Sequence, residues 1–248
     1  MVRPFARHYD SIYADKDYES DIAVLSALCG NKSFSESRVL EIGAGTGSHT
    51  VRLASRVKEL VSVEIDPDFA KLARQKVEAA ACANVRLNSA PLEQLASGTF
   101  DGAAAFFHVL NYIAPANRLS FLEALSSRLR PGAWFVTDFW NGDAVMRDPP
   151  RRETRNKIHG TMAIQQTIAP ALDIPSNTVT LAYQLDIRDG DSSESFAEEL
   201  KLYIWPLGDL EALLAKAGFA DMQFWDRRKF PATATSDSWQ VWMRAIRQ

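Results

Sequence analysis

Three glycines at every second position, Gly43, Gly45 and Gly47, constrain the fold of this chain more than any other feature. They follow the largely apolar residues 39–42, which are typical of a buried strand, and a helical pattern begins at Ser48. Because glycine has no Cβ and tolerates positive φ, such a backbone can turn sharply and let a ligand lie against it. A helix start also offers free N–H groups, which favour an electronegative ligand group. The order G-A-G-T-G fits neither the dinucleotide fingerprint G-x-G-x-x-G nor the P-loop, which has a lysine after its last glycine.

A second apolar run, residues 60–63, ends at two carboxylates, Glu64 and Asp66. Glu64 follows Gly43 by about 20 residues, the offset at which a βαβ unit places a carboxylate on ribose hydroxyls. Asp66 stands before Pro67 and a helical pattern, so it is better placed as a helix N-cap with Pro67 at the first helical position. We therefore assign ribose binding to Glu64; the alternative is that both carboxylates serve only solubility and capping.

Four segments resemble motifs of the class I S-adenosylmethionine (SAM)-dependent methyltransferases. E-I-G-A-G-T-G at 41–47 and V-E-I-D-P at 63–67 are similar to the first two motifs of that family, and residues 100–107 and 129–134 agree in order and spacing. The resemblance covers about residues 37–140. It implies an α/β fold: a seven-stranded, mostly parallel Rossmann-like methyltransferase sheet with helices on both faces. It also implies SAM as the cofactor and S-adenosyl-L-homocysteine as its product.

The resemblance further implies a set of cofactor-binding residues. The segment with Tyr9 and Tyr13 is similar to the Y-D-x-x-Y lead-in of small-molecule methyltransferases, which folds over the cofactor; packing of both rings on the core is the alternative. Many family members carry an aspartate for the adenine amino group after the third strand. This chain lacks it at residues 89–92, so backbone groups and apolar contacts would hold adenine. The expected cofactor-binding residues are Tyr13, Gly43, Ala44, Gly45, Gly47, Glu64, Ile65, Ala90, Pro91 and Phe107.

The 248 residues fit one methyltransferase domain, residues 1–248. Residues 1–30 are expected to form an N-terminal cap that includes a helix ending at Gly30. Residues 141–205 are expected to form a β-rich insertion that roofs the active site.

Within this insertion the pattern changes from irregular to alternating. Residues 141–155 carry Pro149, Pro150 and several arginines, which predicts a loop. The segments that follow alternate apolar and polar side chains and are separated by turn residues such as Pro170, which predicts an antiparallel sheet with one exposed face. These segments are residues 161–168, 178–187 and 196–204. A helix over 207–217, closed by Gly218, and a hairpin of 219–225 with 239–245 complete the chain.

Composition excludes several classes of function. The net charge of −3 and the pI of about 5.9 give no basic footprint for nucleic acid. No apolar run is long enough for a membrane span, and the N-terminus lacks the apolar core of a signal peptide. Cys29 and Cys82 have no metal-type spacing. We expect a cytoplasmic monomer or homodimer with a small-molecule substrate, no nucleic acid, no membrane contact and no metal.

Candidate catalytic residues follow the fourth and fifth strands, because ligands in open α/β sheets bind beyond the carboxyl ends of the strands. His108 suits a general base; packing without a proton role is the alternative. Tyr112 could hydrogen-bond the substrate, and Asp138, expected to face the same cleft as Trp140, could hold an ammonium or a sugar hydroxyl. Asn111 is a further substrate contact or simply a turn residue.

Two other groups of polar residues have weaker functional interpretations. His49 is expected to orient the glycine loop, and His159 to belong to a strand of the roof. Four arginines lie in the predicted loop, and they are either solvated or form a clamp for a phosphorylated or nucleotide-linked substrate. These are Arg147, Arg151, Arg152 and Arg155.

The sequence thus predicts methyl transfer from SAM to an amino or hydroxyl group of a small polar metabolite, by resemblance a nucleotide-linked sugar. The alternatives are an O-methyltransferase of a polyketide-type or other small hydroxylated metabolite, and a SAM-binding protein without catalysis. The absent adenine aspartate is the reason for the last alternative, and the intact glycines with Glu64 argue against it.

Overall fold

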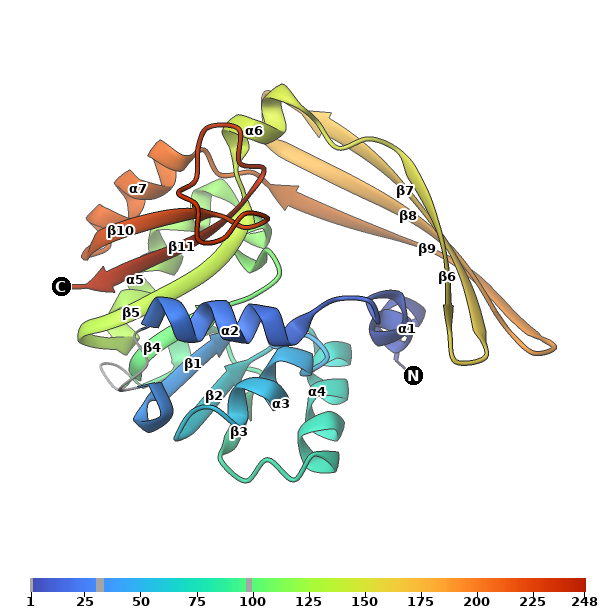
Figure 1. The fold of residues 1–248 in the computed structure, drawn as a ribbon, viewed down its shortest axis with the longest axis horizontal. Helices are drawn as coiled ribbons and strands as arrows, with labels where there is room; N and C mark the ends of the chain where they lie inside the picture. The colour runs from blue at the N-terminus through green and yellow to red at the C-terminus, as the bar shows by residue number, and fades with distance from the viewer. Residues whose placement is uncertain (1, 30–33, 97–99) are drawn as a thin grey trace.

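The computed structural model describes residues 2–29, 34–96 and 100–248, which form two β-sheets and the helices that cover them (Figure 1). The larger sheet has seven strands in the order β10-β11-β5-β4-β1-β2-β3. Strands β1 to β5 are parallel, whereas β11 runs antiparallel to both β5 and β10. The strands are β1 (Arg38–Ile42), β2 (Glu59–Val63), β3 (Val85–Asn88), β4 (Phe100–Ala105), β5 (Leu129–Trp140), β10 (Phe219–Asp226) and β11 (Gln240–Arg247).

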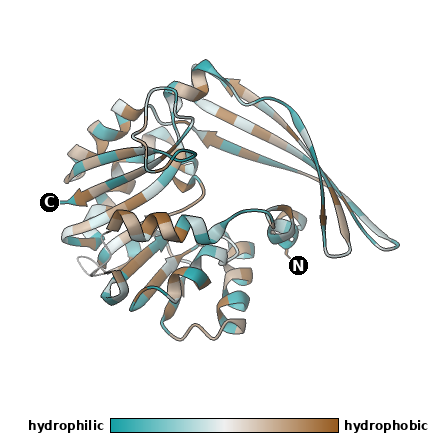
Figure 2. Cartoon of the chain, viewed as in Figure 1, coloured by the Kyte–Doolittle hydropathy of each residue, from teal (hydrophilic) through white to brown (hydrophobic). Residues whose placement is uncertain are grey.

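Helices cover both faces of this sheet. One apolar cluster joins the sheet to α2 (Tyr18–Cys29) and α3 (Ser48–Ala54), and another joins its opposite face to α5 (Arg118–Arg128) and α7 (Leu207–Lys216). The central strands are apolar along most of their length (Figure 2), as expected for strands buried on both faces. The expected fold class is therefore confirmed. The predicted hairpin of β10 and β11 and the closing Gly218, at φ +84°, are confirmed too.

A second, antiparallel sheet extends away from the first, with the order β6-β7-β8-β9 (Figure 1). Alternate side chains such as Ile164, Leu181 and Leu185 face inward and pack with Phe5 and Ile12 of α1 (Pro4–Ile12), as the period-two pattern predicts. Figure 2 shows the same alternation along these strands. The strands are β6 (Glu153–His159), β7 (Met162–Asp173), β8 (Thr178–Asp189) and β9 (Ser192–Tyr203). His159 ends β6, as expected.

Two predictions about this insertion were wrong. Residues 141–155 are not one loop, because Asn141 caps a short helix, α6 (Gly142–Arg147), by accepting the Asp143 N–H at 3.1 Å, and β6 begins at Glu153. Pro170 does not lie in a turn but inside β7. It is tolerated there because β6 pairs with β7 only as far as Ile168, so the edge that lacks its N–H has no strand beside it.

Helix α4 (Pro67–Ala79) begins at Pro67, as the helical pattern after Asp66 predicts. The expected helix end at Gly30 lies outside the described residues. Among the residues that the structure does describe, no helix has the length and apolarity to cross a membrane, and no cluster of metal-ligating side chains occurs.

Candidate functional site

The glycine loop forms the floor of a cavity of about 470 Å³ at the carboxyl ends of β1 and β2. The Gly43 and Ala44 N–H groups both donate to the Val63 carbonyl, at 2.8 and 3.0 Å, which turns the chain sharply after β1. All three glycines have positive φ. A Cβ on Gly43 would lie 2.5 Å from Val109, whereas a Cβ on Gly45 would meet nothing within 4 Å. Gly45 therefore leaves open space above the loop, where a ligand can approach the backbone.

Glu64 lies at one end of this cavity and is buried. Its Oε2 accepts the Gly45 N–H at 2.7 Å and its Oε1 accepts the Asp66 N–H at 2.9 Å. Burial raises the pKa of Glu64, and these backbone donors counteract part of that effect. Each carboxylate oxygen keeps a second lone pair, so the group can still accept bonds from two ligand hydroxyls.

Asp66 has the other role that the sequence predicts. Its Oδ1 accepts the N–H groups of Asp68 and Phe69, and it is the N-cap of α4 with Pro67 at the first position. Its Oδ2 pairs with Arg3 at 2.5 Å. Asp66 thus fastens the N-terminal segment to the start of α4.

Most of the residues expected to bind the cofactor line this cavity, namely Gly43, Ala44, Gly45, Glu64, Ile65, Pro91 and Phe107. Three do not. Gly47 is turned away because it packs closely on Ala73 of α4, and the Ala90 N–H is bound by the Asn88 side chain at 2.8 Å. Tyr13 lines a second, adjoining cavity instead.

The N-terminal segment closes one side of the glycine-loop cavity. Tyr9 of α1 lines it together with Arg3 and Phe5, and the Tyr9 ring lies 5.1 Å from the ring of Phe69. Asp10 Oδ1 accepts the Thr46 hydroxyl at 2.6 Å, so α1 is bonded to the glycine loop itself. Sequence reasoning missed Arg3, Phe69 and Tyr18 as lining residues.

The second cavity, of about 830 Å³, lies between the carboxyl ends of β4 and β5 and the inner face of the second sheet. Four residues line both cavities: Tyr9, Phe107, Tyr112 and Leu200. Much of its wall is aromatic, and the rings of Trp140 and Trp239 lie 4.4 Å apart. The sequence does not predict Trp239 as a lining residue of the second cavity, because only the path of residues 227–240 in the fold brings it there.

His108 lines the second cavity at a strained bend directly after β4. Phe107 and His108 have φ of +62° and +66°, a region that bulky residues rarely adopt. The Phe107 N–H donates to Asp138 Oδ1 at 2.6 Å, and His108 Nδ1 lies 3.1 Å from Asp138 Oδ2. Asp138 therefore holds both the bend and the ring.

Tyr112, the other candidate for hydrogen bonding to the substrate, is half-exposed and lines both cavities.

The expectation that Asp138 faces the cleft together with Trp140 is corrected. Trp140 lines the second cavity, but Asp138 is fully buried behind His108 and lines neither cavity. Its side chain turns inward because two backbone N–H groups, the His108 ring and the Arg227 guanidinium surround it. Asn111 is also fully buried; its amide joins the Trp140 N–H to the Tyr203 carbonyl, which is a structural role.

All four arginines of the predicted loop line the second cavity, together with Arg228. Three carboxylates, Asp148, Glu153 and Asp237, also line it, so the wall keeps an excess of positive charge. Arg147 is held by Asp237 at 2.6 Å, whereas Arg151 and its partner Asp148 are both mostly exposed. The cluster is therefore placed where a bound anion would meet it.

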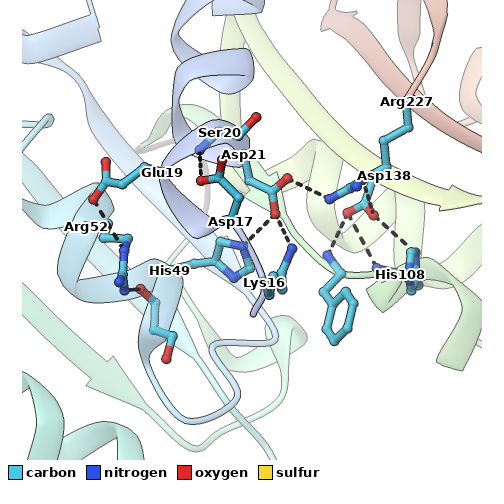
Figure 3. Close-up of polar contacts among 12 residues, drawn as sticks. Lys16, Asp17, Glu19, Ser20, Asp21, His49, Arg52, His108, Asp138 and Arg227 are labelled. Atoms are coloured by element: carbon cyan, nitrogen blue, oxygen red, sulfur yellow. Dashed lines mark hydrogen bonds and ion pairs between the residues drawn. The ribbon is translucent and has the colours of Figure 1, made fainter. Parts of the chain in front are cut away.

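His49 is buried beside the glycine loop. Its ring stacks on Phe106 at 4.5 Å, and its Nε2 lies 3.0 Å from Asp21 Oδ2 (Figure 3). Asp21 also binds Lys16 and Arg227. Sequence reasoning missed Asp21 and Arg227, because a charge at a helix start or in a charged turn gives no sign of burial.

Comparison with known proteins agrees with this architecture. Residues 39–132 match the family model of the methyltransferase domain. The chain is 36% identical over 83 residues to a probable ribosomal RNA small subunit methyltransferase A of Methanosarcina mazei, which covers 32% of this chain and 31% of that protein. It is 32% identical over 110 residues to the magnesium-protoporphyrin O-methyltransferase of Rhodobacter capsulatus, and the match covers 42% of this chain and 49% of that protein. The chain thus spans only about a third to a half of these curated relatives.

Solved structures match along the whole chain. DesVI of Streptomyces venezuelae superposes with a TM-score of 0.83 at 14% identity, covering 100% of both chains. CalS10, an amino pentose methyltransferase of Micromonospora echinaspora solved with SAM bound, gives 0.77 at 18% identity over 97% of this chain and 96% of that one. KedS8, a sugar N-methyltransferase of Streptoalloteichus sp., superposes with a TM-score of 0.76 at 16% identity, covering 97% of this chain and 92% of that one. Residues 39–132 therefore match a methyltransferase domain, and the chain as a whole shares the fold of these solved structures.

Proposed function

We propose that this protein transfers a methyl group from SAM to an amino or hydroxyl group of a small polar metabolite, and that the favoured class is a nucleotide-linked sugar. The observation that carries the proposal is the pair of adjoining cavities. One lies over the glycine loop and the other carries the arginines, and the same residues, Tyr9, Phe107, Tyr112 and Leu200, line both. Two substrates bound side by side would meet at these residues.

The glycine-loop cavity fits SAM. Gly45 leaves room for close approach to the backbone, Glu64 can accept two ribose hydroxyls, and Pro91 and Leu92 offer an apolar wall for adenine in place of the absent aspartate. Tyr9 and Phe107 present aromatic faces, which favour a positively charged sulfonium. Ala44 and Ile65 complete the set of predicted residues that line this cavity.

SAM supplies an electrophilic methyl group, which passes to the acceptor as the carbon–sulfur bond breaks. The chain's own part is to hold the acceptor in line, exclude water and accept the proton that the acceptor loses. His108 lines the acceptor cavity, and its Nδ1 lies 3.1 Å from Asp138 Oδ2, so Nε2 is the nitrogen that would accept that proton. Tyr112 is placed at the junction of both cavities as a hydrogen-bonding group.

The arginines suggest the substrate class. A diphosphate bound near Arg151, Arg152 and Arg228 would receive forked hydrogen bonds, and the sugar attached to it would point toward His108. Two structural neighbours are described as methyltransferases of an amino pentose and of a sugar nitrogen, which supports the same class.

The test is methylation of a panel of nucleotide-linked amino and hydroxy sugars, followed by mass spectrometry. We expect the double variant Arg151→Gln/Arg152→Gln to raise the KM for such a sugar about tenfold or more, because each charged hydrogen bond contributes about 1.5–3 kcal/mol. The kcat should change little. Arg188→Gln on β8, which lines neither cavity, is the matched control. An unchanged KM would remove the phosphate-binding role.

One observation favours a second candidate. The acceptor cavity carries the aromatic side chains of Tyr13, Trp140, Tyr183 and Trp239, which would also stack on a planar polyketide-type hydroxyl substrate. Adding such acceptors to the panel separates the two classes. Methylation of a planar phenol that does not depend on Arg151 and Arg152 would support this O-methyltransferase and overturn the sugar.

A further inference from the structure

A chain of alternating charges crosses the interior from the N-terminal segment to the acceptor cavity (Figure 3). Arg227 lies between two buried carboxylates: its NH2 is 2.6 Å from Asp21 Oδ1 and its Nε is 3.3 Å from Asp138 Oδ2. Asp138 in turn lies 3.1 Å from the His108 ring. Four charged or polar groups from α2, the segment after β10, the end of β5 and the end of β4 therefore meet in one row.

Asp138 is the centre of this row and is fully buried. Burial alone would raise its pKa, but His108, Arg227 and Lys16 outweigh burial and hold the pKa well below its usual range. Its other oxygen accepts the Phe107 N–H at 2.6 Å. The ionised carboxylate thus binds the backbone of the strained bend and the ring of His108 at the same time.

Asp21 anchors the other end of Arg227. It is almost fully buried and is surrounded by Lys16 at 2.5 Å, His49 at 3.0 Å and Arg227. Burial would raise the pKa of Asp21, but these three partners lower it. Lys16 lies between α1 and α2, and His49 lies in α3 directly after the glycine loop. Asp21 therefore ties Arg227 to the wall of the glycine-loop cavity.

Burying so many charges is weak evidence for a gain in stability, because desolvation offsets most of the attraction. A role at the adjoining cavity explains the row better. We propose that Arg227 is a positioning residue, which keeps Asp138 against Nδ1 of His108 so that Nε2 remains the proton acceptor toward the methyl acceptor. The kinetic part of this inference rests on the proposed function, whereas the state of the His108 ring does not.

The experiment reads the His108 tautomer by NMR of protein labelled with ¹⁵N-histidine, with His108→Asn for assignment among the four histidines. At about pH 8.5, above the usual titration range of histidine, we expect the Nδ1–H tautomer in the wild type. Arg227→Gln should give a mixture of tautomers. Asp138→Asn should reverse the tautomer, because an amide NH₂ facing the ring would donate to Nδ1.

The kcat and KM values of the same variants are then measured with the methyl acceptor that the panel of sugars and phenols identifies. Arg227→Gln should lower kcat about threefold or more while both KM values stay within about twofold, because only molecules with the Nδ1–H tautomer can accept the proton at Nε2. Arg227→Lys should restore part of the rate, because it keeps the charge but not the fork that spans both carboxylates.

The matched control is Arg244→Gln, because Arg244 of β11 also ties α2 to the seven-stranded sheet, through the Leu28 carbonyl, without touching Asp138. It should leave tautomer and kcat unchanged. A wild-type tautomer in Arg227→Gln, or a kcat loss no larger than that of Arg244→Gln, would overturn the inference. If Arg227→Gln does not fold, Arg227→Lys decides instead: a tautomer and a kcat equal to those of the wild type would overturn the inference. A wild type with the Nδ1–H tautomer but no transferase activity would leave the positioning intact and reject the proposed function.

Discussion

At the scale of single residues, two carboxylates at the end of β2 have different tasks although only one residue separates them. Both line the glycine-loop cavity, but Glu64 binds the backbone of Gly45, whereas Asp66 caps α4 and pairs with Arg3. The difference follows from Pro67, which begins the helix directly after Asp66 and makes Asp66 its N-cap.

Glu64→Ala should weaken SAM binding at least about tenfold, because two hydrogen bonds from ribose to a charged acceptor are lost. Isothermal titration with SAM and with S-adenosyl-L-homocysteine measures the effect on both ligands. Asp66→Ala is the matched control: it should lower the free energy of unfolding by about 1 kcal/mol through the lost cap and leave SAM affinity within about threefold. Equal SAM affinity in Glu64→Ala and the wild type would contradict the ribose assignment.

At the scale of elements, β1 carries a buried acid beneath the glycine loop. Glu41 Oε2 accepts the hydroxyls of Thr50 in α3 and of Ser62 in β2, both at 2.7 Å. Burial raises the pKa of Glu41 to about 7, although these hydroxyls lower it. The acid thus joins a strand, a helix and a neighbouring strand at the point where the chain turns.

This raised pKa makes stability depend on pH. Between the ordinary value of 4.5 and about 7 the folded protein binds a proton that the unfolded chain has lost, so the free energy of unfolding falls as pH rises through this window. Glu41→Gln does not titrate, and its stability relative to the wild type should rise by about 3 kcal/mol between about pH 4.5 and 8. Chemical denaturation at several pH values measures this.

Glu59→Gln on β2, near the surface of the same sheet, should follow the wild-type pH profile. Parallel pH profiles for Glu41→Gln and the wild type would show that Glu41 is ionised in the folded protein.

At the scale of the whole molecule, α1 joins the two sheets over the glycine-loop cavity. Arg7 and His8 contact Glu194 of β9 at 2.5 and 2.9 Å, and Arg3 pairs with Asp66. Figure 1 shows α1 between α4 and the second sheet. Because these pairs are partly exposed, salt screens them, and each contributes at most about 1 kcal/mol.

We therefore expect the SAM dissociation constant to rise a few-fold between about 0.05 and 0.5 M NaCl, as α1 loosens over the cavity. Glu194→Gln should raise the constant at low salt and reduce its salt dependence, with the melting temperature within about 2 °C of the wild type. Titration calorimetry at both salt concentrations measures this. The same salt slope in both proteins would show that α1 closes the cavity without this pair.

Local sequence by itself determined the central fold and the glycine-loop cavity. The glycines, the apolar runs and the N-cap at Asp66 act over a few residues, and the second sheet follows from period-two alternation in the same way. Patterns of this range cannot show where a side chain at a strand end turns, so Asp138 was expected in the cleft and lies behind His108.

Contacts between distant segments were decided only by the tertiary structure. Arg227 reaches Asp21 across 206 positions, and the indole of Trp134 lies where a Cβ on Gly102 would stand, at 2.0 Å. Neither has a local signal, because burial and pairing of such groups depend on which strands and helices become neighbours. The sequence therefore determined the elements and the glycine loop, whereas the tertiary structure decided the second cavity and the charges behind His108, because packing of separate segments creates both.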